Sequence, residues 1–255
     1  RPAHKNALWG GRSRSGFEWA PGTIYTQTDF EGYVPRTGES ESARDLMRSI
    51  LSAYGIALAL GLLVDDPWRA AEESAPFYAL CIFKEDGGPE AHVTNVDFDH
   101  AHLMKFKRLG NFSVFNSQTQ SPDLHRRVGE IGKVLSKGGP RLLNAARWYF
   151  DSHCGSSDQV RFVQICTALE VLLGDESQGR EVGLASLMAN RCAYFLGKND
   201  KQRTQINEDF RAAYAIRSKI VHAGKSKLST DDKAHLLYMQ SLCTAIIRKE
   251  CTEIE

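Results

Sequence analysis

Apolar residues recur every three or four positions through most of the chain after residue 120, which is the spacing of amphipathic helices. The pattern predicts a helix near 121–135 and five more beyond it, separated by short stretches rich in glycine, serine and aspartate. These five are expected at 141–153, 158–173, 182–196, 203–222 and 231–251. Because short loops make neighbouring helices run antiparallel, residues 121–255 are predicted to form an all-α bundle.

Residues 1–120 follow a different pattern. A broad apolar face predicts one long helix from Ser40 or Ser42 to about Val64. Short apolar or alternating runs, typical of strands, are found at 23–28, 77–83, 91–98 and 111–116. We therefore expect an α+β protein, in which a mixed α/β N-terminal region (1–120), a possible sensor or substrate guide, precedes the bundle.

Composition is that of an ordinary globular protein, with 42% hydrophobic and 25% charged residues among 255. The longest apolar run, 56–64, is too short to span a membrane, and no signal peptide opens the chain. The six cysteines are scattered without a C-x-x-C pair, which favours reduced thiols over disulfides. These features predict a soluble, cytoplasmic protein with no membrane partner.

Basic residues gather between 198 and 227, although the net charge of the whole chain is only +1. Eight lysines and arginines stand there against three carboxylates, and among them Arg217 and His222 lie five positions apart. A guanidinium binds phosphate at any accessible pH, and an imidazole can move a proton near neutrality. RNA carries its own nucleophile, the 2′-hydroxyl, so this pair could cleave it without a metal. The alternative is a surface arginine and a histidine that interacts with a helix end.

The spacing limits how this pair can act. Five residues along a helix separate two side chains by about 140° and about 7.5 Å. Arg217 and His222 therefore cannot grip one atom while both remain in a regular helix. They could flank one phosphate if His222 sits at a frayed helix end, or if a second copy of the chain completes the site.

Other groups of polar residues give weaker indications of a functional site. The stretch 97–102 contains two aspartates and then two histidines, but a strand would place Asp97 and Asp99 on one face and His100 and His102 on the other, so no metal site is expected. No zinc spacing or glycine-rich phosphate loop is present, and we expect no cofactor. Glu170 lies beside an apolar stripe and needs a partner, since a buried unpaired charge is costly. Arg191 is a candidate for that partner, or for a second phosphate ligand.

Residues 141–250 resemble the HEPN superfamily, and most closely its ApeA-like branch. The resemblance is carried by 168–173, by the helix at 184–196 with Arg191, and above all by 214–224. The defining motif of the family is an arginine, usually followed by a polar residue, and a histidine that stands after four to six intervening residues. Arg217, Ser218 and His222 match it, although many active members have Asn, Asp or His where this chain has Ser218.

The resemblance implies a metal-independent endoribonuclease whose site is formed between two copies in a homodimer. It implies that Arg217, Ser218 and His222 are catalytic and that Glu170 supports them. RNA, which could be transfer RNA, would be bound by Lys219, Lys225, Lys227, Arg191 and Tyr214. Similar proteins act in prokaryotic phage defence or toxin systems, often with an activator or antitoxin. The alternative is a non-catalytic HEPN module for dimerisation or for nucleotide or RNA binding.

Overall fold

The computed structural model describes residues 41–65, 79–81, 93–95, 109–110, 121–175 and 183–254. The chain divides into two compact units. The smaller unit includes two short antiparallel strands, β2 (Ala79–Cys81) and β3 (Val93–Asn95), in which Leu80 lies opposite Thr94. The larger unit contains Arg48–Ala75 and Asp99–Glu255, and it includes every residue of the predicted site.

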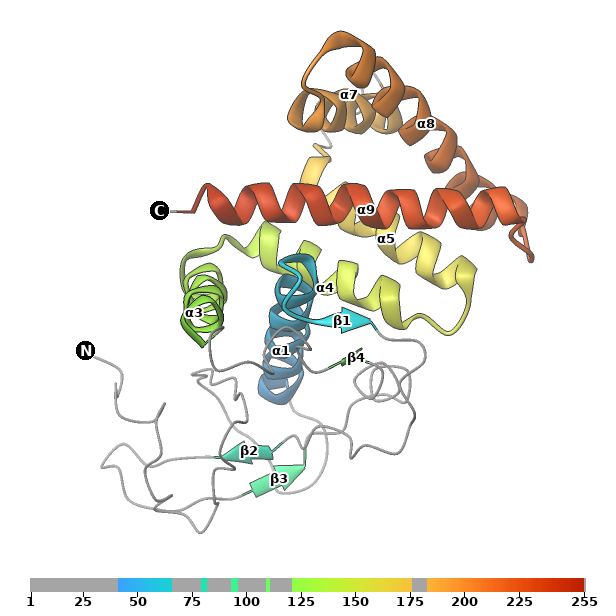
Figure 1. The fold of residues 1–255 in the computed structure, drawn as a ribbon. Helices are drawn as coiled ribbons and strands as arrows, with labels where there is room; N and C mark the ends of the chain where they lie inside the picture. Colours follow the sequence, from blue (N-terminus) through green and yellow to red (C-terminus); the bar gives the residue numbers. More distant parts are fainter. Residues whose placement is uncertain are drawn as a thin grey trace. The chain divides into compact units, whose positions relative to one another are not determined.

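Helices make up most of what is described of the larger unit (Figure 1). The seven helices of the described residues are α1 (Glu41–Ala59), α3 (Ser121–Lys137), α4 (Pro140–Cys154), α5 (Asp158–Leu173), α7 (Leu184–Leu196), α8 (Asp200–Ala223) and α9 (Thr230–Thr252). A two-residue ladder joins β1 (Val64–Asp65) to β4 (Leu109–Gly110). The helices, and not these strands, therefore supply the core of this unit.

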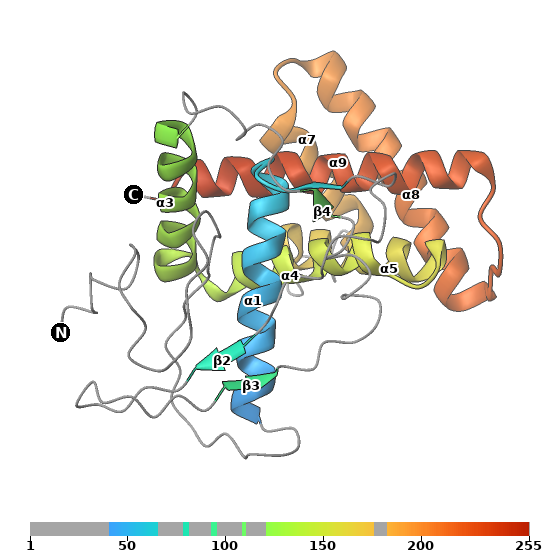
Figure 2. The same ribbon diagram turned by 60° about the horizontal axis from the view of Figure 1, so that its bottom comes forward.

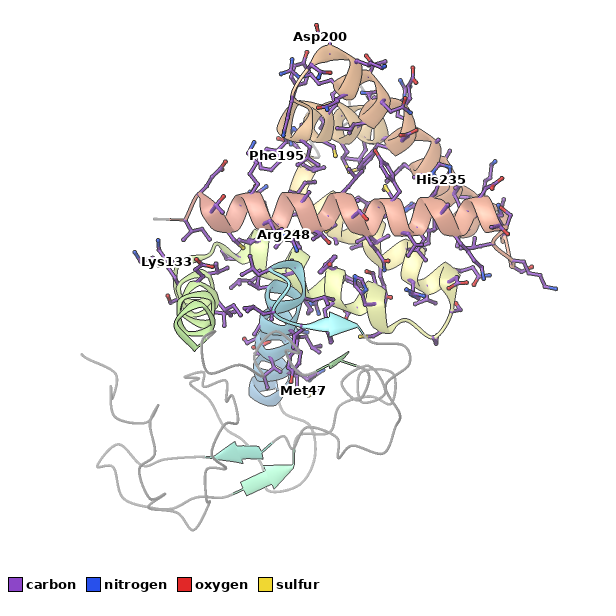
Figure 3. The ribbon with its side chains drawn as sticks, viewed as in Figure 1. Met47, Lys133, Phe195, Asp200, His235 and Arg248 are labelled. Carbon is purple, nitrogen blue, oxygen red and sulfur yellow. The ribbon has the colours of Figure 1, made fainter. Side chains whose placement is uncertain are left out.

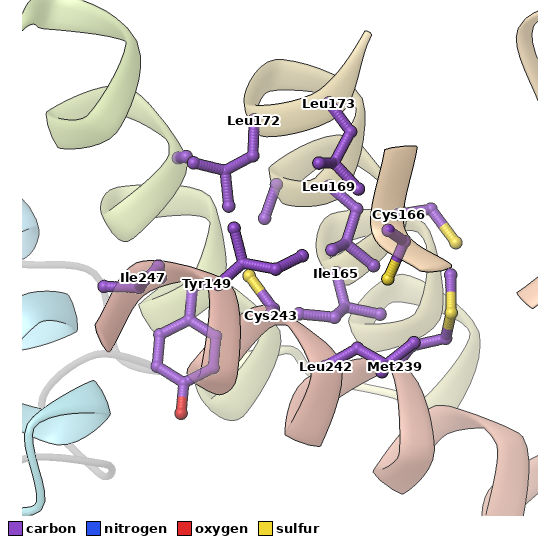
Figure 4. Close-up of a cluster of buried hydrophobic side chains, with 14 of the residues drawn as sticks. Tyr149, Ile165, Cys166, Leu169, Leu172, Leu173, Met239, Leu242, Cys243 and Ile247 are labelled. Carbon is purple, nitrogen blue, oxygen red and sulfur yellow. The ribbon is translucent and has the colours of Figure 1, made fainter. Parts of the chain in front are cut away.

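The α9 helix lies between the α4–α5 pair and the α7–α8 pair and contacts all four helices (Figures 1 and 2). Ile165 and Leu169 of α5 meet Leu242 and Cys243 of α9 in the buried cluster between them (Figure 4). On the other side, Phe195 of α7 lies near α9 (Figure 3), and its carbonyl oxygen accepts a hydrogen bond from Lys249 at 2.9 Å. Burial of apolar surface on both sides of α9 thus holds the bundle together.

Polar residues at the helix ends set where the helices begin. The side chains of Ser157 and Asn199 accept hydrogen bonds from the first turns of α5 and α8. Ser229 and Asp232 form a capping box at the start of α9, each side chain bonding the backbone N–H of the other. These bonds satisfy backbone donors that a helix start leaves without partners.

The α1 helix packs against α4 through a glycine. A Cβ atom placed on Gly55 would lie 1.9 Å from the carbonyl oxygen of Ala146, so the two backbones approach closely there. Next to this contact, the rings of Tyr54 and Phe150 are 5.5 Å apart, and Ile56 is fully buried. The α1 helix from Arg48 onward is therefore part of the bundle.

The expectation of an α+β fold with a mixed α/β N-terminal region is wrong. The principal described element before residue 120 is α1, which packs with the bundle helices. The described strands have only two or three residues each and form two separate ladders, too small to bury a core. The runs at 77–83 and 91–98 do contain β2 and β3, but a ladder of three residues is not a sheet around which a mixed α/β region could form.

The helical pattern after residue 120 is confirmed, with all six predicted helices found within a few residues of their expected bounds. The predicted strands at 23–28 and 111–116, and the aspartate–histidine stretch at 97–102, lie outside the described residues. The domain boundary at residue 120 stays a prediction. Within the described ranges, no helix combines the length and apolar character needed to cross a membrane.

The close approach at Gly55 predicts that Gly55→Ala lowers the free energy of unfolding by about 1–3 kcal/mol, because the added methyl group overpacks the α1–α4 contact. Gly132→Ala is the matched control, since Gly132 is exposed in α3 and a Cβ there meets nothing within 4 Å. It should raise stability by roughly 0.5–1 kcal/mol through helix propensity. Urea unfolding measures both changes, and equal effects at the two positions would contradict this packing.

Candidate functional site

The end of α8 carries the arginine–histidine motif. The helix continues through His222 to Ala223, and Gly224 then turns out of it with φ 63° and ψ 33°. Glycine adopts this left-handed conformation without steric cost, and its N–H bonds the carbonyl oxygen of Lys219. His222 therefore lies in the last regular turn of the helix. Within one copy, its side chain leaves α8 about 140° away from that of Arg217.

Arg217 lies on the inward side of α8, where it pairs with Glu170 of α5. Its Nη2 atom is 3.3 Å from Oε1 of Glu170, and each side chain is 23% exposed. The guanidinium carbon also lies 5.6 Å from the centre of the Tyr214 ring, within the range of a cation–π interaction. Arg217 is thus held by a carboxylate and by an aromatic face.

Tyr214 completes this group, which we call the Glu170 cluster (Glu170, Tyr214 and Arg217). Its hydroxyl donates a hydrogen bond to Oε1 of Glu170 at 2.7 Å, and its ring stacks on Phe210. Burial, and then the neighbouring Glu170, raises the pKa of Tyr214 well above its ordinary value. The hydroxyl therefore remains protonated and acts as a donor at neutral pH.

Arg191 does not pair with Glu170. Its Nη1 donates to the carbonyl oxygens of Leu173 and Gly174 at 2.8 and 3.4 Å, and its Nη2 lies 3.5 Å from Asp175. These contacts hold the C-terminal end of α5, whose last carbonyls lack helical partners. The structure therefore assigns Glu170 to Tyr214 and Arg217, whereas Arg191 fixes the end of the helix that carries Glu170.

The remaining predicted residues lie on the outer side of α8 and in the loop after it. Ser218, Lys219, His222 and Lys227 are exposed. Lys225 instead forms an ion pair with Asp232, with 2.5 Å between Nζ and Oδ2. The motif thus has an inward half, the arginine, and an outward half, the serine and histidine.

The loop between α8 and α9 is anchored at both ends. Gln159 of α5 donates to the carbonyl oxygen of Ser226, and the capping box with its Lys225 ion pair fixes the start of α9. Hydrogen bonding to Lys225 lowers the pKa of Asp232 to about 2. Neither Gln159 nor Asp232 was predicted from the sequence to hold this loop. A serine followed three residues later by an acid, just before an apolar pattern, is the signal that could have revealed the capping box.

No family model, curated protein or solved structure matches the chain. Across the described ranges, no three His, Cys, Asp or Glu side chains gather as metal ligands would. Membership of the HEPN superfamily therefore stays a prediction that rests on the motif residues themselves.

The depressed pKa of Asp232 predicts a pH-dependent effect of Asp232→Asn. A carboxyl whose pKa is lower in the folded state stabilises the fold above its unfolded pKa, near 3.8, and loses this effect as pH falls toward 2. The variant should lose about 1–2 kcal/mol at pH 7, and roughly half of that at pH 3.

Urea unfolding at the two pH values measures this loss. Asp231→Asn is the matched control, because Asp231 is exposed in the same helical turn. It should cost only about 0.3–1 kcal/mol through the helix dipole. A loss for Asp232→Asn that is the same at pH 3 and pH 7 would contradict the ion pair with Lys225.

Proposed function

We propose that this protein is a metal-independent endoribonuclease of the HEPN type. The observation that carries the proposal is the set Arg217, Ser218 and His222 at the C-terminal end of a long helix. His222 and Ser218 are exposed, and Arg217 keeps part of its guanidinium accessible. Lys219 and Lys227, both exposed, form no ion pair with any described residue, and such cations attract a polyanion.

The site requires two copies of the chain. Arg217 and His222 leave α8 about 140° apart, so one copy cannot direct both at the same phosphate. Two copies that meet through the ends of α8 would bring two histidines and two arginines into one cleft. We therefore propose a homodimer as the active form, with no cofactor.

The chemistry follows from the residue types. The imidazole of His222 takes the proton of the ribose 2′-hydroxyl, and the 2′-oxygen then attacks the adjacent phosphorus. The bond from phosphorus to the 5′-oxygen breaks, and this oxygen takes a proton from the imidazolium of the second copy. The products are a 2′,3′-cyclic phosphate and a 5′-hydroxyl. Proton transfers of this kind accelerate reactions by about 10²–10⁴-fold.

The other residues support this reaction. Arg217 stabilises the negative charge that grows on the phosphorane, and Ser218 orients one of the reacting groups. Lys219 and Lys227 guide the RNA backbone, whereas Lys225 acts mainly through Asp232 to hold the loop. DNA resists cleavage because it lacks the 2′-hydroxyl. An RNase of this type suits a prokaryotic defence or toxin system controlled by an activator or antitoxin.

A second candidate is a binding module without catalysis. The ion pair with Glu170 favours it, because it already neutralises the charge of Arg217. His222 also forms no hydrogen bond with a described residue that would orient its ring, as a catalytic base usually requires. Such a module would bind RNA or a nucleotide and turn over neither.

The proposal predicts RNA cleavage in EDTA that requires His222. His222→Ala should lower the rate at least about 100-fold, since it removes the proton-transfer group. Single-stranded RNA and transfer RNA serve as substrates, and the new ends are mapped for cyclic phosphates. His235→Ala is the matched control, because His235 lies in α9 outside the motif (Figure 3) and should leave the rate unchanged.

Two outcomes would contradict the nuclease. Cleavage that survives His222→Ala, or cleavage of DNA by the same preparation, would show that another activity is being measured. RNA binding without cleavage by the folded dimer would favour the binding module.

A further inference from the structure

The Glu170 cluster joins two donors to one carboxylate oxygen. Oε1 of Glu170 accepts from the Tyr214 hydroxyl at 2.7 Å and lies 3.3 Å from Nη2 of Arg217. The guanidinium carbon lies over the Tyr214 ring, 5.6 Å from its centre. Arg217 is therefore paired with Glu170 of α5 and lies over Tyr214 of α8, and these two contacts limit the direction of the guanidinium.

Arg217 uses little of its hydrogen-bonding capacity in this arrangement. A guanidinium has five N–H donors. In Arg217 the Nε atom is buried without a hydrogen-bond partner, and the described residues give Nη1 none. Arg141 shows the contrast, because its Nη2 lies 2.9 Å from both carboxylate oxygens of Glu250 and its Nη1 bonds the Leu172 carbonyl. Because the buried Nε is out of reach of an outside ligand, the donors that Arg217 retains for a second anion are on its Nη atoms.

The charges of the pair cancel locally. Glu170 and Arg217 are each mostly buried, so solvent and salt screen them less than surface charges. The nearby Cys166 remains a neutral thiol, since burial raises its pKa. A phosphate that approaches Arg217 is attracted by the guanidinium and repelled by the carboxylate beside it.

We propose that Glu170 is the positioning residue of Arg217 and that it competes with the RNA phosphate for the guanidinium. The identity of the anion as an RNA phosphate rests on the proposed function. A side chain held in place before binding loses less conformational freedom when its ligand arrives. Glu170 therefore directs the arginine for catalysis and, in the same contact, weakens the binding of RNA.

Glu170→Gln tests this competition, because glutamine keeps the shape and an acceptor for Tyr214 but removes the charge. The probe is a fluorescent 2′-O-methyl oligoribonucleotide, which cannot be cleaved, and its Kd is measured by fluorescence anisotropy. We expect E170Q to bind it roughly three- to tenfold more tightly than the unaltered protein. With cleavable RNA, KM and kcat should both fall, a combination that a purely structural role would not produce.

A double-mutant cycle with Arg217→Ala distinguishes competition for the guanidinium from the general effect of removing one negative charge from the protein. In the R217A background the gain from E170Q should disappear, because there is no guanidinium left to release. Glu250→Gln is the matched control, since it removes the carboxylate partner of Arg141 in the same bundle. It should change the Kd less than about twofold.

Tyr214→Phe provides a second variant, which is expected to change the affinity for RNA in the direction opposite to E170Q. Removing the hydroxyl leaves Oε1 of Glu170 to Arg217 alone, so RNA binding should weaken by roughly two- to threefold. Urea unfolding confirms that each variant is folded. If E170Q does not fold, the Kd of Y214F decides the question by itself.

The proposal is overturned if E170Q binds RNA no more tightly than the unaltered protein does, or if neither of them binds it. It is also overturned if E170Q tightens RNA binding in the R217A background as well. Tighter or unchanged binding by Y214F would also contradict it. The proposed ribonuclease activity is contradicted by a different result, namely RNA that is bound but never cleaved. In that case the measured affinities still decide the role of Glu170.

Discussion

The regularity of α8 up to its last turn is the constraint on which the candidate site depends. Because the helix does not fray before Ala223, Arg217 is directed toward α5 while His222 faces outward. In the proposed ribonuclease, a frayed end would let one copy assemble both groups, and the regular end is the reason for proposing a second copy. The left-handed Gly224 ends the helix just beyond the histidine and leads the chain into the loop before α9.

Packing around α9 maintains this geometry. Its contacts with α4, α5, α7 and α8 fix the distance between the helix that carries Glu170 and the helix that carries Arg217. The capping box at its start and the bond from Gln159 hold the connecting loop. The site thus depends on buried apolar contacts for its spacing, and on a few polar contacts for the position of its outer edge.

Local sequence signals predicted the helices well, because a repeat of three to four residues is a property of each segment by itself. The partners of Glu170 could not be predicted this way. Tyr214 lies 44 residues from Glu170 in sequence, and only the packing of α5 on α8 brings the two together. The packing of α1 on α4 could not be predicted for the same reason, since Gly55 gives no sign in the sequence that it allows a close helix contact.

The contact at Gly55 also bears on how sequence divergence in this protein should be interpreted. No side chain larger than hydrogen fits between α1 and the Ala146 carbonyl. Substitution of Gly55 is therefore disfavoured as long as α1 keeps its position against α4. Glycine is therefore expected to persist at this position in any descendant of the chain that keeps the α1–α4 contact. Invariance alone would therefore mark a packing contact and a reaction centre alike, and only the chemistry of the side chains tells the two apart.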